Sequence, residues 1–90
     1  MKWMEVCEHY PDRIVLVEAL ESTSINNIRT IEDMSIIAEF NEDLEAWHEY
    51  KKLHKNSPDR ELYIFHTSKE KAEVKEHFLL GLEIVYDHAY

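Results

Sequence analysis

A chain of 90 residues, 44 % of them hydrophobic, has room for one core, and we expect residues 1–90 to form a single domain. The formal net charge of −9 argues against binding to DNA or RNA, because nucleic-acid binders neutralise phosphates with basic side chains. The longest apolar runs are far too short to cross a membrane, and the one cysteine, Cys7, excludes a disulfide within these residues.

The N-terminal residues have neither the basic start nor the apolar stretch of a secretory signal. Together with the lone thiol, this indicates a reducing compartment, and we expect a cytoplasmic protein. The charge is uneven, because residues 1–45 hold 11 acids and 3 bases whereas residues 46–90 hold 8 acids and 7 bases. The acidity is explained by solubility or, alternatively, by attraction to a basic protein partner.

The first third of the chain is expected to contain a helix, a strand and a loop. Four apolar residues follow the spacing of one helix face: Trp3, Val6, Cys7 and Tyr10. Pro11 ends this short helix, and residues 13–20 then form a strand that is apolar on both faces and therefore central. Residues 21–33 are rich in Ser, Thr and Asn without a sustained period, which predicts a long loop.

The middle of the chain predicts a strand and the main helix. Residues 34–40 alternate apolar and polar side chains, as in a half-buried strand. Asn41 is a suitable N-cap, and residues 42–55 have acids at one end, lysines at the other and apolar residues at three-residue steps. We expect Trp47, which shares a face with Leu44, to anchor this helix to the sheet.

The last third predicts further strands. Residues 61–67 are apolar on both faces and indicate a third strand. The next segment combines helix formers with a later alternating pattern, so helix and strand are both open there. We expect a turn or a short helical turn at residues 68–73, a strand within residues 74–86 and a frayed C-terminal tail at residues 87–90.

This order of elements predicts an α+β fold. We expect a small, mostly antiparallel sheet of three to four strands, with the main helix on one face and a short N-terminal helix. The strands at 13–20 and 61–67 are apolar on both faces, so the second face needs the N-terminal helix, the C-terminal segment or a second subunit. We therefore expect self-association through apolar sheet surface, as a homodimer or another homo-oligomer.

The short motifs do not define a known chemistry. His48 begins an H-E-x-x-H pattern, but Lys52 occupies the position of the second zinc ligand. Residues 68–71 match S-x-x-K, but the S-D-N and K-T-G elements that this chemistry requires are absent. Gly81 is the only glycine, which argues against a glycine-rich phosphate loop. We expect no cofactor, no metal and no catalytic residues.

One group of residues is a candidate site. His66 stands at the end of an apolar strand and is followed by Thr67 and Ser68, and loops after strands often carry functional residues. An alternative function is therefore a small enzyme or a metal-dependent protein with a histidine and carboxylate site around His66. The histidines that could join it are His48, His54 and His77.

Three stretches carry a resemblance. They are residues 10–18 (YPDRIVLVE), 46–50 (AWHEY) and 60–68 (RELYIFHTS). Together they resemble small bacterial proteins that begin with a helix, a Y-P-D turn and a strand, a family with no assigned activity. The resemblance implies a bacterial cytosolic protein with an α+β fold and assigns no functional residue. The leading expectation is a non-enzymatic interaction or regulatory module that self-associates.

Overall fold

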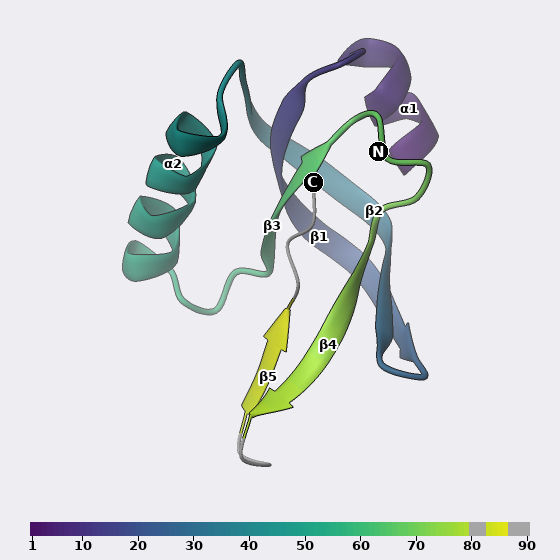
Figure 1. Ribbon diagram of the computed structural model, residues 1–90, viewed down its shortest axis with the longest axis vertical. Coiled ribbons are helices and arrows are strands. Elements are labelled where there is room, and N and C mark those ends of the chain that lie inside the picture. Colours follow the sequence, from purple (N-terminus) through teal and green to yellow (C-terminus); the bar gives the residue numbers. More distant parts are fainter. Residues whose placement is uncertain (80–82, 87–90) are drawn as a thin grey trace.

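The computed structural model describes residues 1–79 and 83–86. They form an antiparallel sheet with helices on both sides (Figure 1). The elements are α1 (Trp3–His9), β1 (Ile14–Ile25), β2 (Ile28–Phe40), α2 (Asp43–Asn56), β3 (Leu62–His66), β4 (Glu73–Leu79) and β5 (Glu83–Tyr86). The strand order is β3-β1-β2-β4-β5, and each neighbouring pair is antiparallel. The predicted α+β class, with one main helix and a short N-terminal helix, is confirmed.

The centre of the sheet is a long hairpin, and the loop predicted at residues 21–33 is wrong. β1 and β2 stay paired up to Ile25 and Ile28, the two residues that flank the turn. The turn consists of Asn26 and Asn27, whose φ angles of 52° and 65° are both positive. Positive φ at both central residues is the signature of a type I′ turn, and asparagine tolerates this conformation better than most residues.

Irregular pairing explains why the sequence pattern of a strand was hidden. The register of β1 and β2 shifts three times, between Leu16 and Val17, between Ala19 and Glu21, and between Glu21 and Ser22. Each extra residue bends the hairpin and moves the following side chains to the other face of the sheet. A period of two therefore cannot be followed along this segment, although its backbone is fully strand-like.

One face of the sheet is covered by α2. The buried side chains between them are Ile14, Leu16, Ala46, Leu62 and Ile64. The helix lies within one residue of its predicted range, but its N-cap is Glu42 rather than Asn41. The side chain of Asn41 instead accepts a hydrogen bond from Arg13.

Leu44 does not share the buried face of α2, which corrects the sequence prediction. Its side chain is 80 % exposed, whereas Ala46 is fully buried. Three residues advance only 300° around a helix, so side chains spaced at three-residue steps rotate gradually around the helix surface instead of staying on one face. Trp47, Tyr50 and Leu53 pack against the core and are only partly buried.

The other face of the sheet is covered by α1 and by the chain around residues 72–74. The buried side chains are Trp3, Val6, Val15, Val17, Ile31, Met34, Tyr63, Phe65, Ala72 and Val74. Both faces of β1 and β3 are thus apolar, as predicted. Val15, Leu16 and Val17, which point to opposite faces of the sheet in turn, are all fully buried within one chain.

The C-terminal segment forms a second hairpin. Residues 67–71 are turns and bends rather than a helix, and the strand expected within residues 74–86 is present as two strands, β4 and β5. β4 pairs with β2 only next to the turn of the first hairpin and then continues beyond it to pair with β5 (Figure 1). The tail predicted at residues 87–90 lies outside the described residues.

Across residues 1–79 and 83–86, no helix combines the length and the apolar character needed to span a bilayer.

Candidate functional site

Thr67, one of the three candidate residues, joins the end of β3 to the turn between α1 and β1. Its side-chain hydroxyl donates to the Tyr10 carbonyl at 2.7 Å and accepts from the Arg13 backbone N–H at 2.9 Å. The Thr67 backbone N–H also donates to the Arg13 carbonyl at 2.8 Å. Because Thr67 is only 7 % exposed and its hydroxyl is satisfied internally, its role is to hold these two segments together.

The other two candidate residues, His66 and Ser68, contact each other at the surface. The Ser68 backbone N–H donates to His66 Nδ1 at 3.1 Å, so the neutral ring carries its hydrogen on Nε2. Ser68 Oγ lies 2.8 Å from the same Nδ1, and His66 Nε2 lies 3.6 Å from Asp12 Oδ1. A carboxylate, an imidazole and a hydroxyl in this sequence can activate a serine for nucleophilic attack.

His66 and Ser68 lie at an exposed turn. The Asp12 side chain is 93 % exposed, so water screens its carboxylate from the imidazole. Catalysis on a bound substrate also needs a hollow beside the nucleophile. A hollow of about 530 Å³ is lined by Thr67 and by residues 69–72, but not by His66 or Ser68.

The same hollow is mostly apolar and is lined in part by Cys7. Its walls include Trp3, Met4, Cys7 and Ile31. Burial raises the pKa of the Cys7 thiol, which lowers the fraction of reactive thiolate at neutral pH. No three His, Cys, Asp or Glu residues of the described chain lie close enough together to hold a metal ion. His48 and His54 are exposed on α2, and His77 has no described side chain.

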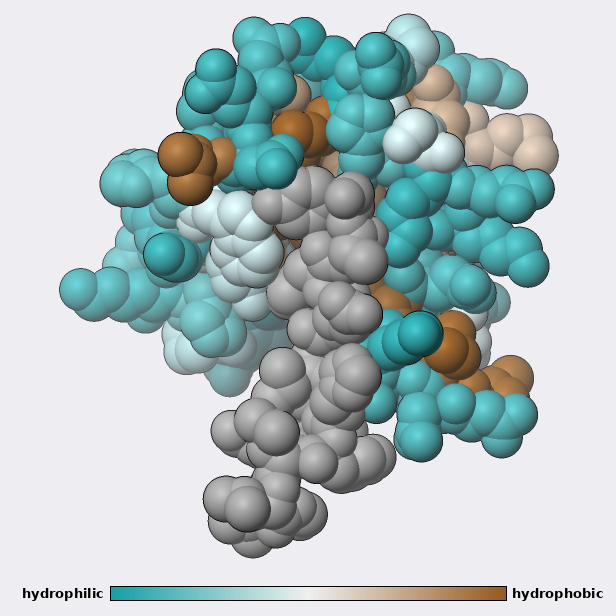
Figure 2. Space-filling model, viewed as in Figure 1, coloured by the Kyte–Doolittle hydropathy of each residue, from teal (hydrophilic) through white to brown (hydrophobic). Residues whose placement is uncertain are grey.

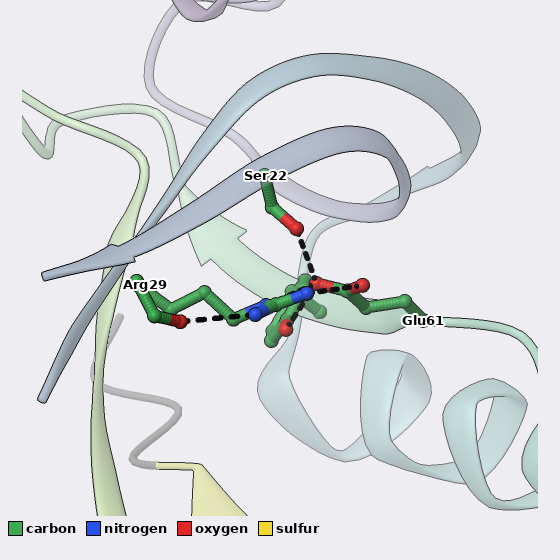
Figure 3. A network of polar contacts seen from close by, with 5 residues as sticks. Ser22, Arg29 and Glu61 are labelled. Carbon is green, nitrogen blue, oxygen red and sulfur yellow. Dashed lines mark hydrogen bonds and ion pairs between the residues drawn. The ribbon is translucent and has the colours of Figure 1, made fainter.

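A polar network centred on Glu61 was missed by the sequence analysis (Figure 3). Glu61 Oε2 accepts hydrogen bonds from Arg29 Nε at 2.6 Å, from Tyr63 Oη at 2.7 Å and from Ser22 Oγ at 3.1 Å. Its Oε1 accepts from Arg29 Nη2 at 2.9 Å. Arg29 Nη1 donates to Ser24 Oγ at 3.0 Å. The network therefore connects the outer part of the β1–β2 hairpin to the start of β3.

The network stabilises the ionised form of Glu61. Burial alone would raise the pKa of this carboxyl, but hydrogen bonds from Arg29, Tyr63 and Ser22 outweigh burial and hold the pKa below its ordinary value. The sequence contained one signal of this contact. Arg29 is the only charged residue within 22–31, a segment that is otherwise polar or apolar.

The outer half of β1 is a free sheet edge. β3 pairs with β1 only from Ile14 to Glu18, with one further bond from the Ala19 N–H to the Glu61 carbonyl. In an antiparallel pair, alternate residues direct N–H and C=O away from the partner strand. Ile25 and Ile28 flank a two-residue turn and are a bonded pair, so Ser24 and Ser22 direct their backbone groups outward.

This outer edge is exposed and carries a single charged side chain, that of Glu21. No other described strand pairs with it, and its residues 23–25 are exposed to solvent. Large apolar side chains stand at its two ends, Leu20 with 58 % exposure and Ile25 with 70 %. Residues 22–28 carry no charged side chain. Figure 2 shows apolar surface over the turn end of this hairpin, at the lower right.

The fold and these contacts define a small α+β protein with an antiparallel sheet, a polar network around Glu61 and an open strand edge. No family model, no curated protein and no solved structure matches the chain.

Proposed function

We propose that this protein is a non-enzymatic interaction module that self-associates as a homodimer. The observation that carries the proposal is the open outer edge of β1, between the exposed side chains of Leu20 and Ile25. An unpaired edge presents backbone N–H and C=O groups that a further strand can bind. Edges of this kind are a recurrent route to recognition, because backbone hydrogen bonds supply affinity.

The structure changes the surface on which the proposal rests. The sequence predicted association through an uncovered apolar face of the sheet. Both faces of β1 and β3 are instead closed within one chain, since Val15, Leu16, Ile64 and Phe65 are all fully buried. Within the part of the sheet whose side chains are described, β1 and β3 therefore offer a second copy no apolar face to cover, and the outer edge of β1 is the surface on which we base pairing.

Self-association is tested by sedimentation equilibrium over a micromolar to millimolar concentration range. We expect the mass to rise from 10.8 kDa towards twice that value as concentration increases. We also expect association to strengthen with added salt, because each copy carries a charge of −9 and salt screens the repulsion. A mass of 10.8 kDa at every concentration and salt level would contradict the proposal.

The proposal includes a cellular setting and a second partner. The resemblance to small bacterial proteins and the lone cysteine support a bacterial cytoplasmic module. The acidic first half of the chain supports a basic protein as a further partner. Neither a nucleic acid nor a membrane is part of the proposal.

One contact favours a second function, hydrolysis at Ser68. The Ser68 hydroxyl lies 2.8 Å from the unprotonated Nδ1 of His66, the geometry of a nucleophile beside its base. An activated serine reacts with a fluorophosphonate reagent, and intact-mass spectrometry detects the adduct. We expect no adduct, because the Asp12 carboxylate is exposed and the hollow lined by Thr67 does not include His66 or Ser68. Labelling of the wild type that is lost in Ser68→Ala would instead establish the second function.

A further inference from the structure

We infer that two copies of the chain pair through the outer edge of β1, antiparallel and with Thr23 facing Thr23 of the second copy. The two hairpins then form one continuous sheet about a two-fold axis. This inference rests on the proposed self-association and specifies the surface that performs it. Pairing of an edge with itself closes a dimer and leaves no further β1 edge free, so it does not propagate.

The register follows from the direction of the backbone groups. Ser22 and Ser24 direct N–H and C=O outward, so these residues must form the bonded pairs of the new interface. Antiparallel pairing around Thr23 places Ser22 opposite Ser24 of the second copy, and each such pair exchanges two hydrogen bonds. An axis at Ser22 or Ser24 would leave only one serine–serine pair, and a register shift of one residue would set outward-directed groups against inward-directed ones and lose these bonds.

The edge is held in an extended conformation before any partner arrives. The side chains of Ser22 and Ser24 are bound to Glu61 and Arg29, respectively, and Arg29 is bound to Glu61 through two nitrogen atoms. Both serines therefore lose little conformational freedom on pairing, which lowers the entropic cost of association. Their outward backbone groups remain available, because the network uses only the side chains.

Charge favours this edge over the other exposed apolar surfaces. Residues 22–28 carry no charged side chain, and in this register Glu21 is opposite Ile25 of the second copy, so the pairing of two copies with a charge of −9 each sets no acid directly against another. Leu44 is 80 % exposed but lies between Asp43 and Glu45, so contact there would bring acids together. The edge of β3 is inaccessible, since residues 62–65 are at most 5 % exposed.

The size of the interface sets the expected affinity. A ladder of about five residues per strand buries less than the roughly 1,000 Å² typical of stable complexes. We therefore expect a weak, reversible dimer with a dissociation constant in the micromolar range or above. Thr23 at the axis gives a Thr–Thr cross-strand pair, one of the favourable pairs of antiparallel sheets.

The first test compares three lysine substitutions at exposed positions. Thr23→Lys places like charges opposite each other at the axis and should raise the dissociation constant by about fivefold. Met4→Lys on α1 and Leu44→Lys on α2 add the same charge at side chains that are 75 % and 80 % exposed, and should leave the constant unchanged or lower it. Sedimentation equilibrium measures all three beside the wild type.

The second test is cross-linking in a Cys7→Ala background. Facing residues at a non-bonded antiparallel position lie close enough for a disulfide, so Thr23→Cys should form a covalent dimer under mild oxidation, whereas Met4→Cys should not. Selective loss of the dimer in Thr23→Lys and selective cross-linking at position 23 support the inference. If Met4→Lys or Leu44→Lys weakens the wild-type dimer, or if Thr23→Lys does not, pairing through the edge of β1 is ruled out. Self-association itself would still stand. A wild type that stays monomeric overturns both.

Discussion

Replacing Trp3 by alanine is expected to destabilise the fold by about 3–5 kcal/mol, as is usual for large buried aromatics. Trp3 is 9 % exposed and packs edge-to-face on Phe65, with ring centroids 5.4 Å apart. Its Nε1–H donates to the Lys69 carbonyl at 2.9 Å. The substitution thus opens a cavity under α1 and removes a donor from the turn that precedes β4. A small domain is stable by only about 5–15 kcal/mol, so this loss threatens folding.

The matched comparison is Trp47→Ala on the opposite side of the sheet. Trp47 is partly buried and contacts Tyr50 edge-to-face at 5.3 Å, and we expect its loss to cost about 1–2 kcal/mol. Urea unfolding of both variants measures the two costs. Trp3→Phe, which keeps a ring but loses the hydrogen bond, should fall between the wild type and Trp3→Ala. An equal or larger cost at Trp47 would show that α2, not α1, carries the essential tryptophan.

Trp47 packs against the core under α2, as the sequence predicted, but the more buried tryptophan, Trp3, was not recognised as an anchor, for a physical reason. Trp47 lies on a helix of 14 residues with clear acidic and basic ends, so the helix could be recognised from local signals. The face that it buries depends on how the helix lies on the sheet, and this is a tertiary property. Trp3 lies on a helix of 7 residues, yet it reaches β3 and residue 69, contacts between segments far apart in sequence.

The candidate site shows the same division between local and long-range information. The position of His66, Thr67 and Ser68 at the end of β3 was predictable, because a short apolar run has a clear end. The partners of Thr67 were not, since Tyr10 and Arg13 lie more than 50 residues away. The outer edge of β1 was hidden by bulges, which break the alternation that identifies strands.

Replacing Arg29 by methionine is expected to destabilise the fold by about 2 kcal/mol at neutral pH. The ionised, partly buried carboxylate of Glu61 then loses the hydrogen bonds that Arg29 donates. The matched control is Arg60→Met. Arg60 binds Glu18 through a single nitrogen at 2.8 Å, at a more exposed position, so its loss should matter less. Equal effects of the two substitutions would mean that the Glu61 network is an ordinary surface ion pair.

The dependence on pH distinguishes the loss of an ionised partner from a general packing defect. The pKa of Glu61 is lowered in the folded protein, so the stabilisation is present above the ordinary glutamate pKa of about 4.3 and disappears as pH falls through the lower folded value. In Arg29→Met, burial raises the pKa of Glu61 with less opposition, so protonation relieves the variant as pH falls. The stability difference between wild type and variant, measured by urea unfolding, should therefore shrink between about pH 6 and pH 3.5.

A difference that stays constant over this range would assign the effect to the lost volume of the arginine side chain. In that case the network does not depend on ionised Glu61, and the edge of β1 is held by packing alone.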